Sequence, residues 1–194
     1  MNLIKIDHDK IVLKQLEPKD VSDAYVKWLN DPEVNKFLEI RHKIPILKED
    51  VIEFVEMCNR KKRYHLGIMY DKKHIGNISC GIVNKIYNYV NISNLIGEKK
   101  YWNSDISKLS LNAAMHYLFF NSMFNSIGAG TYAIHLSGIT LLTNLGFKKE
   151  GVFRDRALVN GRYVDTVLFG ITKKEWELRD NYLPLVKVDK PFWE

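Results

Sequence analysis

Three strand-like runs follow one another closely in the middle of the chain, and they constrain its fold more than any other feature. The runs cover residues 64–70, 74–82 and 89–96. The connections between them, at 71–73 and 84–88, are too short for a crossover helix, and strands joined this tightly pair antiparallel. The sequence therefore predicts an antiparallel meander within a mixed α/β protein.

Further helices and strands are expected on either side of this meander. Before it, the sequence predicts a strand at 11–16, a helix at 20–28 with Asp20 as its N-cap, a short helical piece at 33–38 and a helix at 48–60. After it, we expect a helix of about 17 residues capped by Asp105, a strand at 127–134, a short helix at 137–144, and a hairpin of 150–158 and 163–172. No linker or repeat divides the chain, so we expect a single α/β domain over 1–194, with 183–194 as an extended C-terminal arm.

The composition is that of an ordinary globular protein. Hydrophobic residues make up 46% and charged residues 27% of the 194 residues, which excludes the disordered and fibrous classes. The net charge of +6 suits an anionic small molecule, but the chain has no Lys/Arg block of the kind that binds nucleic acid. We therefore expect no nucleic-acid partner.

Neither the first residues nor the cysteines point to secretion, a membrane or a metal. Lys5, Asp7 and Lys10 stand where a secretory leader needs an apolar run, and the longest apolar stretch is far too short to span a bilayer. Cys58 and Cys80 lie in no Cys-x-x-Cys pair and near no His at metal-ligand spacing. We expect free thiols, no metal, and a cytoplasmic protein without a membrane partner.

The strand at 89–96 leads through a polar turn into the helix that Asp105 opens. The first N–H groups of a helix have no partner within it and lie at the positive end of its dipole, so such a turn suits a pyrophosphate. Because no glycine follows Gly97 in this turn, the same residues also fit a plain helix N-cap.

Several segments match a known family in order and spacing. They are 28–35 (Trp-Leu-Asn-Asp-Pro-Glu-Val-Asn), 74–78 (His-Ile-Gly-Asn-Ile), 95–99 (Leu-Ile-Gly-Glu-Lys), 101–102 (Tyr-Trp), 145–151 (Leu-Gly-Phe-Lys-Lys-Glu-Gly) and 161–165 (Gly-Arg-Tyr-Val-Asp). In this order the chain resembles the GCN5-related N-acetyltransferase (GNAT) family of acyl-CoA-dependent enzymes. The resemblance implies a mixed, mostly antiparallel sheet flanked by helices, splayed where strands 89–96 and 127–134 part, with CoA in the gap.

The resemblance also implies which residues bind acyl-CoA. The family's pyrophosphate turn aligns with 102–107, where Asp105 and Ser107 replace its two glycines. Asp105 then turns away as an N-cap, or weakens CoA binding, or marks a protein that has lost the activity. The expected CoA-binding residues are Leu95, Ile96, Gly97, Trp102, Asn103, Ser104, Asp105, Ile106, Ser107, Lys108 and Thr140.

Two residues are candidates for proton transfer. His135 stands where the family has an asparagine, and Leu142 stands where it has a tyrosine or phenylalanine, so no tyrosine at that site protonates the CoA thiolate. An imidazole exchanges protons near neutral pH, and a residue that only hydrogen-bonds the pantetheine is the alternative for His135. Glu98 follows the strand at the thioester, where it is either a base or a solvated carboxylate.

The segment 37–42 resembles a branch of the family that acylates nucleotide-linked amino sugars in surface-polysaccharide synthesis, such as that of lipopolysaccharide O-antigen. The resemblance implies an amino-dideoxy-sugar nucleotide as acceptor and an acetyl or slightly larger acyl group as cargo. The expected acceptor-binding residues are Glu39, Arg41, His42 and Asn94. A ribosomal-protein alanine N-acetyltransferase and a non-catalytic CoA-binding module are the alternatives, and a homodimer is left open.

Overall fold

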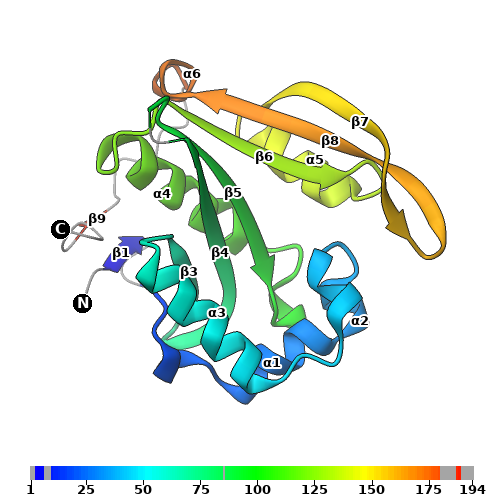
Figure 1. Ribbon diagram of the computed structural model, residues 1–194. Helices are drawn as coiled ribbons and strands as arrows, with labels where there is room; N and C mark the ends of the chain where they lie inside the picture. The colour runs from blue at the N-terminus through cyan, green and yellow to red at the C-terminus, as the bar shows by residue number, and fades with distance from the viewer. Residues whose placement is uncertain (1–2, 7–9, 85, 180–186, 189–194) are drawn as a thin grey trace.

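The computed structural model describes residues 3–6, 10–84, 86–179 and 187–188, which form one nine-stranded sheet with helices against it (Figure 1). The strand order is β7-β8-β6-β5-β4-β3-β2-β1-β9. The strands are β1 (Leu3–Ile6), β2 (Ile11–Gln15), β3 (His65–Tyr70), β4 (Lys73–Asn84), β5 (Tyr89–Ile96), β6 (Ser126–Tyr132), β7 (Lys148–Val159), β8 (Arg162–Thr172) and β9 (Lys187–Val188). All neighbours pair antiparallel except β5 and β6, and the predicted meander is confirmed as β3, β4 and β5.

Three α-helices precede the meander and three follow β5. They are α1 (Asp23–Asn30), α2 (Pro32–Asn35), α3 (Lys48–Arg60), α4 (Ile106–Phe120), α5 (Leu136–Asn144) and α6 (Lys173–Glu177), with short 3-10 turns η1 (Pro18–Asp20), η2 (Glu39–Lys43) and η3 (Lys99–Tyr101). Among the residues that the structure describes, every helix is too short or too polar to cross a membrane.

The register of the meander decides which side chains lie together on one face of its three strands. His65, Ser79 and Ser93 lie directly opposite one another across β3, β4 and β5. Residues paired in this way point to the same side of a sheet. Tyr25 of α1 and Phe54 of α3 both contact the His65 ring, so α1 and α3 cover this face.

The opposite face of the meander packs against α4. Leu66, Ile78 and Asn94 form the next row of paired residues, and Asn94 hydrogen-bonds Ser107 in the first turn of α4. Burying an aliphatic or aromatic side chain contributes about 1.5–3 kcal/mol, so α4 is a major part of the core. Its large buried hydrophobic side chains are Ile106, Leu111, Met115, Tyr117, Leu118 and Phe119.

The sheet is splayed between β5 and β6. Only three residue pairs join the two strands, Tyr89 with Ser126, Val90 with Ile127 and Asn91 with Gly128. From Ile92 onward β5 stays paired with β4 while β6 follows β8, and Figure 1 shows β5 and β6 spreading apart from their common start near α6. The predicted parting of these strands, and with it the predicted fold class, is confirmed.

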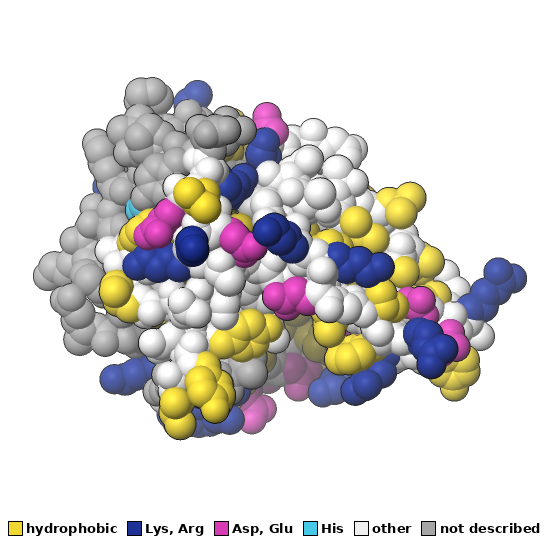
Figure 2. All heavy atoms as spheres, turned by 90° about the horizontal axis from the view of Figure 1, so that it is seen from above, with side chains coloured by type: hydrophobic (Ala, Val, Ile, Leu, Met, Phe, Trp, Pro, Cys, Tyr) yellow, Lys and Arg dark blue, Asp and Glu magenta, His cyan; other side chains and the backbone are white. Residues whose placement is uncertain are grey.

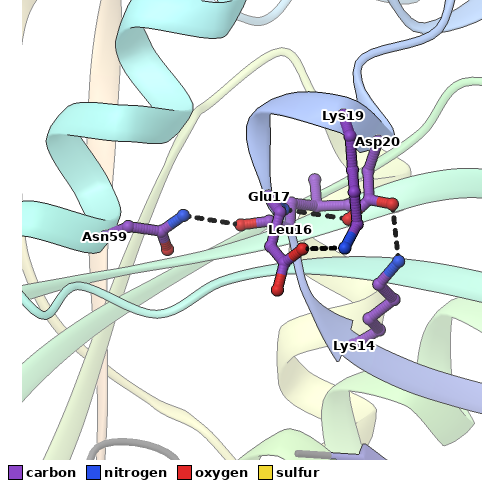
Figure 3. Close-up of polar contacts among 6 residues, drawn as sticks. All are labelled: Lys14, Leu16, Glu17, Lys19, Asp20 and Asn59. Carbon is purple, nitrogen blue, oxygen red and sulfur yellow. Dashed lines mark hydrogen bonds and ion pairs between the residues drawn. The ribbon is translucent and has the colours of Figure 1, made fainter. Parts of the chain in front are cut away.

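The prediction that Asp20 caps the first helix is wrong. The Asp20 carboxylate accepts the Glu17 N–H at 2.9 Å and the Lys14 ammonium at 2.5 Å, and so closes the preceding turn η1 (Figure 3). Ser22 caps α1 instead, because its hydroxyl accepts the N–H of Tyr25 at 3.2 Å. Asp20 and Ser22 are both favourable N-cap residues and lie two positions apart, so the sequence alone does not show which of them caps α1.

Other differences concern short elements. β1 and α6 were not predicted, and the helical piece expected at 33–38 ends at Asn35. Most of the predicted C-terminal arm lies outside the described residues, but Lys187–Val188 pairs with β1 as β9. Elements of two to five residues carry too little periodicity for a pattern to reveal them.

Both cysteines are free thiols, as predicted, and both are buried. Burial raises the pKa of the Cys80 thiol to about 12. On the face shown in Figure 2, Lys and Arg side chains are interspersed with Asp and Glu. The positive net charge is therefore not gathered into one basic field on this face.

Candidate active site

The exposed edge of β5 borders the gap in the sheet. The Gly97 N–H donates to the Ile75 carbonyl of β4 at 2.9 Å. Successive residues of a strand turn their N–H groups to opposite edges, so the Ile96 N–H points away from β4 into the gap. The Ile96 carbonyl on that edge accepts the Trp102 indole N–H at 2.8 Å. Of the predicted group Leu95, Ile96 and Gly97, Ile96 therefore presents its backbone N–H to the gap.

Two segments that carry the family resemblance meet at the end of β5. A side chain at Gly97 would lie 2.0 Å from the Trp28 ring, so only glycine lets α1 pack across the strand here. Lys99 forms ion pairs with Asp31, at 2.8 Å, and with Glu33. These contacts fix the turn that precedes α4.

The first turn of α4 is the end of the gap where the sequence predicts a pyrophosphate. Asn103 adopts a left-handed backbone (φ 61°), which asparagine tolerates better than most residues. Asp105 occupies the N-cap position of α4, as predicted, but its side chain makes no cap hydrogen bond. The N–H groups of this turn, Lys108 and the Ser107 hydroxyl fit a pyrophosphate. The Ser104 hydroxyl already donates to the Tyr101 carbonyl at 2.6 Å, and the exposed Asp105 carboxylate opposes an anion.

A pocket of about 720 Å³ lies on the opposite face of β5. Its walls come from α1, the loop around η2 and α3, and its floor comes from β3, β4 and β5. The lining residues are Tyr25, Leu29, Leu38, Glu39, Ile40, Lys43, Ile46, Asp50, Val51, Glu53, Phe54, Met57, His65, Asn77, Ser79, Ser93, Asn94 and Leu95. Leu95 and Asn94 are shared with the predicted site, and the pocket thus reaches the splayed stretch of β5.

The floor of this pocket is polar, which sequence reasoning missed. His65 is only 2% exposed, and its ring bonds the Tyr25 hydroxyl through Nε2 at 2.9 Å and the Ser79 hydroxyl through Nδ1 at 2.7 Å. Burial lowers the pKa of His65 to about 4, so the ring is neutral at physiological pH. Asn77 and Ser93 lie beside it. Polar residues at alternate positions of two otherwise apolar strands were the available signal.

His135 lies across the gap, beyond the end of β6. Its ring stacks on Phe37 with centroids 4.0 Å apart, and Nδ1 is 3.0 Å from the Thr131 hydroxyl. A side chain at Gly138 would lie 2.6 Å from Nδ1, so the ring is held from both sides. Burial lowers the pKa of His135. His135 does not line the pocket, and the predicted Thr140 is exposed on α5.

The segment expected to bind the acceptor bridges the gap. The Arg41 guanidinium donates to the Leu38 carbonyl at 2.7 Å, the Tyr132 hydroxyl at 2.9 Å and the Leu158 carbonyl at 2.9 Å. The same Tyr132 hydroxyl donates to Glu39. Arg41 therefore ties η2 to β6 and β7, and its predicted role at a diphosphate stays a prediction.

The remaining candidates are His42, which is exposed, and Glu98, which is half-buried. His42 follows Arg41 in the chain. Glu98 forms an ion pair with Lys73 at 3.1 Å. Its role as a base stays a prediction. Among the described residues, no group of three or more His, Cys, Asp or Glu side chains is placed to hold a metal ion.

Comparisons with known proteins decide the family. The family model described as "Acetyltransferase (GNAT) domain" matches residues 13–168. The chain belongs to the GNAT acetyltransferase family. A relative of this GNAT chain, the N-acetyltransferase p20 of Bacillus licheniformis, is 23% identical over 172 residues, which cover 87% of this chain and 96% of p20. These findings support an acyl-CoA-dependent N-acyltransferase.

Solved GNAT structures share the fold at low identity. A spermidine N-acetyltransferase from Vibrio cholerae in complex with CoA and spermine matches with a TM-score of 0.77, 17% identity, and coverage of 87% of this chain and 98% of that one. The ribosomal L7/L12 acetyltransferase RimL in complex with CoA gives a TM-score of 0.77, 14% identity, and 88% and 97% coverage. The microcin C7 self-immunity acetyltransferase MccE, in complex with acetyl-CoA and AMP, matches with a TM-score of 0.72 and 18% identity. This match covers 84% of this chain and 93% of the MccE chain.

Proposed function

We propose that this GNAT enzyme transfers an acetyl group from acetyl-CoA to the primary amine of an amino sugar, carried on a nucleotide as the sequence predicts. The main support for this proposal is that the structure offers separate places for the donor and the acceptor. The first turn of α4 and the 720 Å³ pocket lie on opposite faces of β5, and both reach the stretch where β5 leaves β6. A donor on one face and an acceptor on the other meet in that opening.

Each side of the opening has a role in the transfer. Acetyl-CoA supplies the thioester, whose carbonyl carbon is attacked by the amine while the C–S bond breaks. The Ile96 N–H, turned into the gap, donates to the carbonyl oxygen as negative charge develops there. The amine loses one proton to His135, and the same proton is then available to the sulfur.

The chemistry of His135 suits this task. Its lowered pKa keeps the ring neutral near pH 7, which is the state that accepts a proton. With Nδ1 bonded to Thr131, Nε2 is the nitrogen left for the proton. Phe37 holds the ring plane, so the nitrogen has a fixed direction.

The pocket lining supports an amino sugar. Its floor carries uncharged hydrogen-bonding groups, Asn77, Ser79 and Ser93, and these match the hydroxyls of a hexose. Lys43 in the lining is a cation available to a diphosphate, and the exposed His42 lies next to it in the chain. AMP in the MccE complex is a precedent for a nucleotide on this fold.

A polyamine is the second candidate, and a different part of the lining favours it. Glu39, Asp50 and Glu53 also line the pocket, and three carboxylates attract a cationic chain and repel phosphates. Spermine in the Vibrio cholerae complex is the corresponding precedent.

Mass spectrometry of products from one acceptor panel separates these proposals. The panel contains UDP- and dTDP-linked amino sugars, the free amino sugars, spermidine, and Ala- and Ser-initiated peptides, each with acetyl-CoA and propionyl-CoA. Acetylated nucleotide sugars support the proposal, acetylated spermidine alone replaces it with the second candidate, and acetylated peptides alone replace it with an N-terminal acetyltransferase. CoA binding without any product identifies a non-catalytic module.

A further inference from the structure

The floor of the pocket contains an amide group with an unused donor. Asn77 is 4% exposed and lines the pocket, directly opposite Leu95 across the β4–β5 pair. Among the described residues, its Nδ2 has no hydrogen-bond partner. A buried amide donor without an acceptor is unfavourable, so the group needs an oxygen that a ligand supplies.

The neighbouring histidine fixes which way this amide points. His74 Nε2 lies 3.0 Å from the Gly76 carbonyl and 2.8 Å from Asn77 Oδ1. A carbonyl oxygen only accepts, so Nε2 carries the hydrogen and donates to both oxygens. Asn77 Oδ1 is therefore occupied, and Nδ2 is the end of the amide left for a ligand.

The triad of Tyr25, His65 and Ser79 offers a second donor. Two hydroxyls and a neutral imidazole carry three polar hydrogens, and the two bonds between them use only two. Whichever tautomer His65 adopts, one hydroxyl hydrogen of the triad is left over. The floor thus presents donors, and the carboxylates of the pocket come from η2 and α3 above it.

We infer that Asn77, helped by the spare hydroxyl of this triad, determines acceptor specificity by binding an uncharged oxygen close to the reacting amine. The inference rests on the proposed function and narrows its substrate class. Paired residues on neighbouring strands have Cβ atoms roughly 5 Å apart, so an oxygen bound at Asn77 lies within a few bonds of an amine at Leu95. An amine flanked by a hydroxyl or an amide carbonyl meets this requirement, and an alkyl polyamine does not.

The first test uses the unaltered enzyme and two matched probe pairs. Kinetics with acetyl-CoA compare a nucleotide-linked amino sugar with its analogue that lacks the hydroxyl next to the amine, and 2-aminoethanol with propylamine. We expect kcat/KM to be at least tenfold higher for the oxygen-bearing member of each pair. Equal kcat/KM values for the two members of each pair overturn the inference alone. If no member of any pair is acetylated, the proposed function is overturned as well.

The second test removes the donor. Asn77→Ala is expected to lower kcat/KM at least tenfold for the hydroxyl-bearing probe and less than twofold for its analogue, which abolishes the preference. Asn77→Asp replaces the donor with an acceptor and is expected to lower kcat/KM for the hydroxyl-bearing probe further. Asn121→Asp, at the exposed end of α4, is the matched charge control. An equal loss for both members of a pair, with CoA affinity unchanged, shows a structural role and overturns the inference.

Discussion

Arg41 donates a hydrogen bond to the Tyr132 hydroxyl at 2.9 Å although 91 residues separate them in the chain. Arg41 belongs to the loop beside the pocket and Tyr132 ends β6, so this bond joins the two halves of the splayed sheet at the open side of the gap. Tyr132 is 7% exposed, which protects the bond from water.

Replacing Arg41 is expected to destabilise the protein. Arg41→Ala breaks three charge-assisted hydrogen bonds and should lower the free energy of unfolding by about 1.5–3 kcal/mol, measured by urea denaturation. Lys27→Ala, which removes an exposed cation of α1 outside the pocket lining, is the control. If Arg41→Ala keeps full stability and loses only nucleotide-sugar affinity, Arg41 binds the diphosphate as the sequence predicts.

The first turn of α4 is expected to govern CoA affinity. Ser107→Glu places a second carboxylate beside Asp105 and should weaken CoA binding at least tenfold, about 1.4 kcal/mol, in calorimetric titration. Ser107→Ala keeps the N–H and should stay within about threefold of the unaltered protein. An unchanged affinity for Ser107→Glu would place the pyrophosphate elsewhere.

His135 is expected to contribute to kcat. His135→Ala should lower kcat by roughly 10²-fold and leave CoA affinity nearly unchanged. Since the base acts in its neutral form, kcat should fall as the pH drops through the His135 pKa, which burial places below the ordinary value of 6.5. A loss confined to KM, with an unaltered pH profile of kcat, would make His135 a binding residue.

The buried His65 makes stability depend on pH. Its pKa is 6.5 in the unfolded chain and about 4 in the fold, so the unfolded state binds more protons between these values. The contribution of the neutral ring to the free energy of unfolding is fully present above pH 6.5. As the pH falls toward 4, the free energy of unfolding decreases by on the order of 3 kcal/mol. Urea denaturation at pH 7 and pH 4.5 measures it. His65→Gln should reduce this dependence, and an unchanged dependence would assign it to other groups.

Local patterns identified most of the fold. The helix at 48–60 and the strand at 89–96 have the predicted bounds, because each repeats its apolar residues at one clear period over eight or more residues. The splayed pair β5 and β6 came from the family resemblance, since nothing in the residues 92–96 themselves says that a neighbouring strand will leave.

The candidate site was only partly predictable. The turn at α4 was expected from a strand that runs into a helix, but the polar pocket floor was not, because its members come from three separate elements. Tyr25, His65, Asn77 and Ser79 converge only through the register of β3 and β4 and the packing of α1. Likewise, an arginine that ties a loop to a distant strand has the same local sequence as one that binds a phosphate.

The placement of the α4 turn and the pocket on opposite faces of β5 has a kinetic consequence. If the donor binds at this turn and the acceptor in the pocket, as proposed, neither substrate occupies the path by which the other arrives, and both are held at once when the acetyl group moves. In that arrangement the acetyl group passes directly to the amine without being carried on a residue of the chain, and either substrate is free to bind first.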